Sequence, residues 1–229
     1  MSEWWSYGLS DLLMFSPRVY YRLFEGFNTA FWLPNLVLLA CGIVFALLVW
    51  CRIGLAGRLV PGMLAIMWAW VAWGFLWRYY TPVNLAAPWM VGLFAVQVGV
   101  LIAHAVRPKD LVFAWRGDFS SFAGAGMLFV AIVVWPLEAP LSGRAWQGAE
   151  LFGSAPDPTI IGTLGLVLLA RGTWRWTLFP VPVAWCLISS ATLWVMDQDM
   201  AWVMLVVAWL SVLGGWMDQK NGVTRGRLP

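Results

Sequence analysis

Charged side chains gather in one stretch of an otherwise apolar chain, residues 135–159, which read WPLEAPLSGRAWQGAELFGSAPDPT. The stretch holds three acids, Glu138, Glu150 and Asp157, and one cation, Arg144. Carboxylates beside a guanidinium can form ion pairs that fasten a loop, which contribute little when solvated. They can also form a mixed-charge site for a small polar or cationic solute. The residues alone leave both interpretations open.

Asp157 is followed by Pro158 and Thr159. Aspartate before proline is typical of a helix start, with the aspartate as N-cap and the proline in the first turn. We therefore expect Asp157 to cap a helix. If that helix is short and enters a membrane, its N-terminus lies below the lipid headgroups of the outer face. Asp157 and Glu150 would then line an outward-facing crevice. The alternative is a cap and nothing more.

Glu138 is expected to follow a helix C-terminus, where the helix dipole disfavours an exposed carboxylate by about 0.3–1 kcal/mol. A cation should compensate for this cost, and Arg144 and Arg78 are the candidates. Asp197 and Asp199 are expected in a tight turn between two helices, on the same side of the membrane as residues 135–159. A solvated turn is one interpretation, and a cation bound between these acids and Glu138 or Glu150 is the other.

Residues 78–84 (RYYTPVN) are expected to join two helices on this side. Arg78 is flanked by aromatic residues, which favours cation–π stacking, although a ligand carboxylate could also bind there. Asn84 is expected to cap the next helix. The candidate ligand-binding residues are therefore Glu138, Arg144, Glu150, Asp157, Arg78 and Asn84, and no residue is given a catalytic role.

Other chemistry finds little support in the sequence. The chain has a single histidine, His104, and three cysteines without a CxxC motif, so it predicts no haem, zinc site or other cofactor. No Walker loop, HExxH or GxSxG motif is present, and nothing supports an enzyme. Gln97, in the middle of an apolar run, is expected to make an interhelical hydrogen bond.

The elements that must hold these residues are membrane helices. Hydrophobic residues make up 62% of the chain and charged residues only 11%, and the mean hydropathy is +0.77. A bilayer core of roughly 30 Å requires about 20 helical residues. The apolar runs therefore predict an all-α, polytopic transmembrane helix bundle of about seven spans. The expected spans are 29–50, 59–77, 85–106, 119–137, 157–171, 177–196 and 200–217.

The flanking segments complete the predicted architecture. Residues 1–28 are expected to form an amphipathic interfacial segment, with Ser16 as an N-cap before Pro17. The bundle would then cover 29–217, with an outer loop at 138–157, and residues 218–229 would be a cytoplasmic tail. With seven spans, ten of the 14 Lys and Arg residues fall on one side of the membrane. The positive-inside rule then puts the C-terminus in the cytoplasm and the N-terminus outside. The small net charge of +3, spread between apolar runs, argues against nucleic-acid binding.

Four separated segments carry a family resemblance: SEWWSYGLSDLLMFSPRVYYRLFEGFN, RYYTPVNLAAPW, AELFGSAPDPT and PVPVAWCLISSATLW. Together they resemble a family of small polytopic bacterial inner-membrane proteins of unknown function, some of which are labelled permeases. The resemblance implies a multi-pass protein of the bacterial inner (plasma) membrane. It implies no activity, because the family has no established substrate or catalytic residues.

Two functional hypotheses follow. The first is a small-solute carrier or binding protein with an outward-facing site. The second is a non-catalytic accessory subunit or assembly factor of a larger membrane complex. Such a subunit would use its aromatic flanks to bind partner helices, lipid or a quinone-like molecule. Membrane lipid is an expected partner in both cases.

Overall fold

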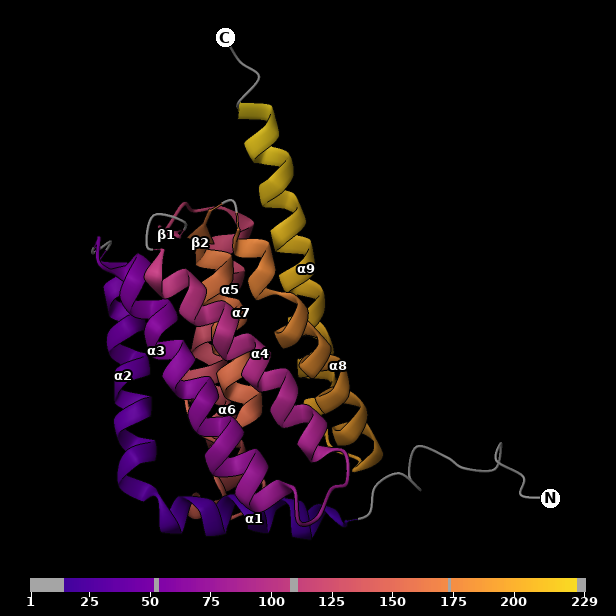
Figure 1. Ribbon diagram of the computed structural model, residues 1–229. Helices are drawn as coiled ribbons and strands as arrows, with labels where there is room; N and C mark the ends of the chain where they lie inside the picture. Colours follow the sequence, from indigo (N-terminus) through magenta and orange to yellow (C-terminus); the bar gives the residue numbers. More distant parts are fainter. Residues whose placement is uncertain (1–14, 52–53, 108–110, 173, 226–229) are drawn as a thin grey trace, which may run out of the picture.

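The computed structural model describes residues 15–51, 54–107, 111–172 and 174–225, and the side chains up to residue 219. The chain forms a helix bundle with one helix lying across one end, which we call the α1 end, and a pair of short strands at the opposite end (Figure 1). Residues 1–14 of the predicted interfacial segment and 226–229 of the predicted tail lie outside the described residues.

The helices and strands follow one another with short connections. In chain order they are α1 (Pro17–Ala30), α2 (Trp32–Trp50), α3 (Ala56–Trp70) with η3 (Val71–Tyr80), α4 (Ala87–Val106), β1 (Val112–Phe113), α5 (Phe119–Phe129) with η5 (Val130–Val134) and α6 (Trp135–Leu141), η6 (Trp146–Gly148), α7 (Pro156–Leu169), β2 (Ala170–Arg171), η7 (Arg175–Leu178), α8 (Pro180–Val195) and α9 (Met200–Arg225). The segments η3 and η5 have the wider turns of a π-helix, and η6 and η7 are 3₁₀ turns.

Six helices are long and apolar enough to cross a membrane, which confirms the all-α polytopic class. They are Trp32–Trp50, Ala56–Tyr80, Ala87–Val106, Phe119–Leu141, Arg175–Val195 and Met200–Gln219. The remaining predicted span, 157–171, corresponds to α7, which has only 14 residues. At about 1.5 Å per residue α7 is about 21 Å long, which is shorter than the hydrocarbon core.

The short helix α7 forms the centre of the bundle. Every residue from Pro156 to Leu169 is buried, because α7 packs against α3, α5, α8 and α9. A helix that is apolar on all sides is expected in such an enclosed position. Its two threonines join the polar interior: Trp68 of α3 donates its indole N–H to Thr163 (3.0 Å), and the Thr163 hydroxyl donates to the Thr159 carbonyl (2.7 Å).

Glycines allow the backbones of α5 and α7 to touch. A Cβ on Gly124 would lie 2.6 Å from the Gly165 carbonyl oxygen, and a Cβ on Gly165 would lie 2.7 Å from that of Gly124. A second pair, Gly42 of α2 and Gly162 of α7, leaves room for the ring of Phe152 between them. Small residues are the usual means by which membrane helices approach this closely.

Helix α1 lies across the end of the bundle (Figure 1). Ser16 is its N-cap, accepting a hydrogen bond from the backbone N–H of Val19 (3.4 Å), and Pro17 occupies the first turn, as the sequence predicted. Tyr20, Phe24 and Phe27 are buried against the bundle. The ring of Phe24 stacks on Phe75, with centroids 4.3 Å apart.

The opposite end is held by arginines and a short antiparallel pairing of β1 with β2. Arg116 donates to the Leu168 carbonyl (3.0 Å) and Arg175 to the Ala170 carbonyl (2.9 Å), so both guanidiniums bind the C-terminal end of α7. Both also bind Asp218 of α9, at 3.0 and 2.8 Å. Cations are favoured at a helix C-terminus by the dipole.

Gln97 corrects one prediction. Its side chain is fully buried on α4, but neither polar atom has a hydrogen-bond partner among the described residues, so the expected interhelical bond is not formed. The physical reason is the apolar packing of this face: α4 packs along α3, which buries mainly apolar side chains. The indole N–H of Trp68 in α3 is used by Thr163 instead.

Candidate functional site

Two carboxylates are buried near the α1 end of the bundle. Asp157, in the first turn of α7, is 1% exposed, and Glu150, in the loop before α7, is 6% exposed. Asp157 accepts hydrogen bonds from the indole N–H of Trp185 (2.7 Å) and from the hydroxyl of Ser189 (2.7 Å). Glu150 accepts one from the indole N–H of Trp135 (3.2 Å). All these donors are neutral.

The prediction that Asp157 is an N-cap is wrong. The N-cap position of α7 is Ala155, and Asp157 lies inside the first turn. Its carboxylate turns to α8, where Trp185 and Ser189 are four residues apart and present two donors on one helical face. Thr159 binds the loop instead, accepting from the Gly153 N–H (2.9 Å) and donating to the Ala155 carbonyl (2.6 Å).

The carboxylates do not line an open crevice, which corrects the second part of that prediction. Ser189 lies six residues before the end of α8 at Val195, so Asp157 is set about 9 Å below that end of the helix. The loop from Ala149 to Ala155 folds into the space that the short α7 leaves, and its Phe152 is buried against α2 and α7. Glu150, which lies in the same loop, is therefore enclosed as well.

Glu138 and Arg144 form the predicted ion pair. Arg144 also donates from Nε to the Ser142 hydroxyl (3.0 Å). Its guanidinium lies over the ring of Tyr21, 3.6 Å from the centroid, so the pair connects the loop to α1. The prediction that Glu138 follows a helix C-terminus is wrong, because Glu138 lies inside α6. Its counter-ion is Arg144 and not Arg78.

Arg78 and Asn84 have other partners. The Arg78 guanidinium lies 5.2 Å from the Trp73 ring and 5.6 Å from the Phe31 ring, which confirms cation–π stacking but on different aromatics from its sequence neighbours. Asn84 accepts a hydrogen bond from the Ala86 N–H (2.8 Å), and Ala86 is the N-cap of α4. Asn84 thus orders the turn before α4 without being its cap. Of the six candidates, the structure brings together Glu150 with Asp157 and Glu138 with Arg144.

Burial dominates the electrostatics around Glu150. Burial and the nearby charge of Asp157 raise the pKa of the Glu150 carboxyl to about 8, against the opposing effects of Trp135 and Arg144. The hydroxyls of α1 respond to the same environment. Burial and the charge of Glu150 raise the pKa of Tyr21 to about 12, and burial with both carboxylates raises the pKa of Tyr20. Tyr20 and Tyr21 are therefore neutral neighbours of the carboxylate pair.

A small cavity with four aromatic residues in its lining adjoins Asp157. Its volume is about 10 Å³, and its lining includes Tyr20, Phe75, Tyr80, Trp185 and Ser189. A space of this size holds no more than about one water molecule. In this conformation the site is therefore closed to anything larger than water or a bare ion.

Helix α1 is fastened over this site by amides. The Asn28 Nδ2 donates to the carbonyls of Gln147 and Ala149, both at 2.7 Å. The Asn28 Oδ1 accepts from Asn35 (2.9 Å), whose own Oδ1 accepts from the Trp70 indole (3.1 Å). This amide chain, Asn28–Asn35–Trp70, links α1 to α2, to α3 and to the loop that carries Glu150.

Sequence reasoning missed the neutral hydrogen-bond donors of the carboxylates, Trp135, Trp185 and Ser189, and their neutral neighbours Tyr20 and Tyr21. The four-residue spacing of Trp185 and Ser189 was an available signal, because it puts a tryptophan and a hydroxyl on one face of an apolar helix. Trp135 gave no such signal, because a tryptophan at the end of an apolar run is typical of a membrane interface. The predicted alternative of a cation near Asp197 gains no support, since no group of three or more metal-ligating side chains occurs within the described residues.

The length and hydropathy of its helices define the chain as a multi-pass membrane protein. It belongs to a family of unknown function, DUF6064, whose family model matches residues 17–220. Comparison with curated proteins and with solved structures found no match.

Proposed function

We propose that this protein is a carrier or binding protein for a small cationic or polar solute, and that Glu150 and Asp157 bind that solute. The observation that carries the proposal is the lack of a counter-ion. Neither carboxylate forms a salt bridge within the described part of the chain, and both are buried. An isolated buried carboxylate is strongly disfavoured unless it takes up a proton or a cation. Ionisable groups enclosed in membrane bundles commonly mark such sites.

The surrounding side chains favour a cation. Trp185, Tyr20, Tyr80 and Phe75 line the adjacent cavity, and aromatic faces attract cations and quaternary ammonium groups. Because the cavity is nearly filled, a solute larger than water requires a rearrangement of α1, whose amide chain would have to open. The closed geometry then corresponds to the occluded state of an alternating cycle.

The proposed orientation places this site toward the outside. Counting α7 as a crossing gives about seven spans, and α7 does join the loop at the α1 end to β2 at the opposite end. In the full sequence, the segments assigned to the opposite end carry ten of the 14 Lys and Arg residues, and the segments at the α1 end carry four. This excess of basic residues supports a cytoplasmic assignment of the opposite end, with the α1 end outside and the bacterial inner membrane as the location.

Cation binding by the purified protein tests the proposal. We expect sodium, potassium or tetramethylammonium ions to raise the thermal unfolding temperature of the protein in detergent. Asp157→Asn and Glu150→Gln should each raise the cation concentration needed for the same stabilisation by at least about tenfold. Asp199→Asn, a matched change of an exposed acid at the same end, should leave it intact. If all three variants respond like the wild type to every cation, the site assignment is wrong.

A second candidate function rests on a different feature. An apolar pocket of about 230 Å³ lies between α2 and α5. Its lining includes Trp50 and Trp115, and the centroids of these two rings are 5.4 Å apart. It favours an accessory subunit that binds an apolar partner, such as a partner helix, a lipid or a quinone-like molecule. Purification in gentle detergent separates the two functions: partner subunits that co-purify in a fixed ratio support the second, and a protein that purifies alone with a bound small molecule supports the first.

A further inference from the structure

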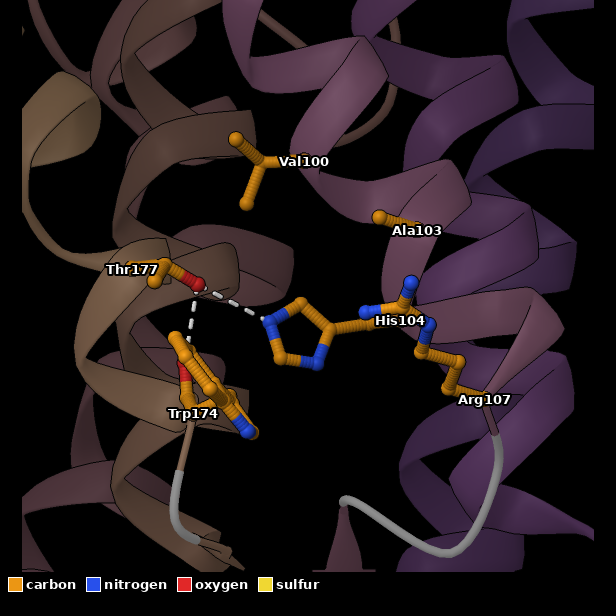
Figure 2. A pocket seen from close by; sticks show the side chains of 6 residues that line it. All are labelled: Val100, Ala103, His104, Arg107, Trp174 and Thr177. Atoms are coloured by element: carbon orange, nitrogen blue, oxygen red, sulfur yellow. Dashed lines mark hydrogen bonds between the residues drawn. The ribbon is translucent and has the colours of Figure 1, made fainter.

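A third pocket lies at the opposite end of the molecule from α1. Its volume is about 190 Å³, and it is lined by Val100, Ala103, His104, Arg107, Trp174 and Thr177. The pocket lies where the end of α4 meets the segment that leads into α8 (Figure 2). Glu150, Asp157 and the aromatic cavity have no part in it, so it is a site separate from the one proposed above.

A hydrogen-bonded pair forms one wall of this pocket. The Thr177 hydroxyl donates its single proton to the Trp174 carbonyl (2.8 Å), so it must accept from His104, whose Nε2 is 3.0 Å away. Nε2 of His104 therefore carries a proton, and the ring orientation is fixed. Figure 2 shows the imidazole reaching from α4 across to Thr177. This contact joins α4 to η7 and keeps the pocket formed.

The pocket also presents a cation. Arg107 is exposed at the end of α4, and its side chain turns back toward the pocket (Figure 2). It makes no salt bridge to any acid that the structure describes. A guanidinium has several donors in a planar fork, which matches the oxygens of a phosphate.

The outer side of the pocket is apolar. Val96 of α4, one turn from Val100, is 59% exposed, Ala103 is exposed, and Trp174 is 61% exposed. In a membrane these side chains face lipid tails, and an exposed tryptophan next to them is typical of the headgroup region. A ligand that binds here should therefore carry an anionic group that contacts Arg107 and an apolar part that lies against the exposed apolar side chains.

We propose that this pocket binds the phosphate headgroup of an anionic phospholipid, with Arg107 contacting the phosphate and an acyl chain lying along the exposed face of α4. Trp174 packs beside the glycerol region. The arginine-rich end of the bundle increases the local concentration of anionic lipid, and basic pockets between membrane helices are suited to such headgroups. The proposal needs neither the carboxylate pair nor solute transport.

Lipid binding by the full chain in nanodiscs tests this inference. The protein is reconstituted in phosphatidylcholine with and without phosphatidylglycerol, and retained lipid is measured by native mass spectrometry. We expect selective retention of phosphatidylglycerol by the wild type and about tenfold weaker retention by Arg107→Gln, which removes a charge-assisted contact. Arg171→Gln is the matched control, because it removes an exposed arginine at the same end that does not line the pocket. It should change retention less than about twofold.

Two further measurements sharpen the test. Val100→Trp fills the pocket without a change of charge, and it should also abolish selective retention while the protein still unfolds cooperatively. Inorganic phosphate should not displace the lipid, because it has no acyl chain. The inference is overturned if Arg107→Gln and Arg171→Gln behave alike, if Val100→Trp retains the lipid, or if inorganic phosphate competes as well as the lipid does.

Discussion

Glu150 and Asp157 are both acids at the α1 end, but their surroundings differ. Asp157 receives two strong neutral hydrogen bonds from α8 and lies at the N-terminus of α7, where the helix dipole favours negative charge. Glu150 receives one longer hydrogen bond, from Trp135, and has no helix terminus beside it. Of the two, Glu150 is therefore the carboxyl better suited to hold a proton near neutral pH.

This difference predicts a pH-dependent stability. Folding raises the pKa of Glu150 from 4.5 to about 8, so the folded protein keeps a proton that the unfolded chain releases between these values. Stability should be greatest at acidic pH and should fall as the pH rises through this window, levelling off above it. Thermal unfolding in detergent across this range measures the effect.

Glu150→Gln should reduce this pH dependence, because glutamine does not titrate. Trp135→Phe is the control: it removes the hydrogen bond but keeps the carboxyl, so the fall in stability should persist. A Glu150→Gln protein with the same pH profile as the wild type would contradict the assignment. Asp157 and Arg144 are the other charges that act on Glu150, and both are unchanged in these variants.

At the scale of elements, α7 is held by complementary groups at each end. Asp157 lies in its first turn, and Arg116 and Arg175 bind its last carbonyls. Burial also acts to raise the pKa of Asp118, but its hydrogen bonds from Arg116 and Ser121 outweigh this and lower it to about 2. Arg116, Arg175, Asp118 and Asp218 therefore form a charged network that joins α5, α7, η7 and α9.

The network predicts a large effect of Arg175→Gln. Arg175 is 4% exposed and binds both Asp218 and the end of α7. The substitution takes one of the two arginine partners from the buried Asp218, which keeps Arg116, and leaves the Ala170 carbonyl without this donor. The lost charge-assisted hydrogen bonds should cost about 1–3 kcal/mol. Chemical unfolding of the purified protein measures this change. The exposed Arg171→Gln should cost less than about 1 kcal/mol, and equal effects of the two variants would be inconsistent with the network.

The contact between α5 and α7 gives a second prediction at this scale. Gly124→Ala and Gly165→Ala should each destabilise the bundle by about 1–3 kcal/mol or more, because a new methyl group would meet a backbone carbonyl that cannot move aside. Gly126 is on α5, like Gly124, but a Cβ added there would lie more than 4 Å from every described atom of the other helices. Gly126→Ala should therefore be neutral or slightly stabilising. Thermal unfolding temperatures of the three variants test this, and the packing argument fails if Gly126→Ala is as harmful as the other two.

For the whole molecule, the proposed orientation can be checked with reporters fused after Pro229. A fluorescent protein should be active there, and alkaline phosphatase, which needs the periplasm, should be inactive. The opposite result would place the α1 end in the cytoplasm. The proposed outward-facing site and the proposed lipid pocket of the inner leaflet would then exchange sides.

Features that depend on a single helix or on residues close together in the chain could be predicted from the sequence. Hydropathy located all six long helices, and local signals found the Ser16 cap and the pairing of Arg144 with Glu138. Contacts between distant helices carried no such signal. The inward turn of Asp157 toward α8 depends on the depth of α7 in the bundle. That depth follows from the packing of Gly124 and Gly165 and from the arginines at its other end.

The depth of Asp157 has an electrical consequence. An ion that reaches this carboxylate from the α1 end passes below the end of α8 and so crosses part of the potential difference between the two faces. Moving one charge across the full membrane is worth about 2.3 kcal/mol per 100 mV. If the proposed site binds a proton or cation, its occupancy should therefore depend on membrane voltage, and an energised cell would hold the two acids in a different charge state from a depolarised one.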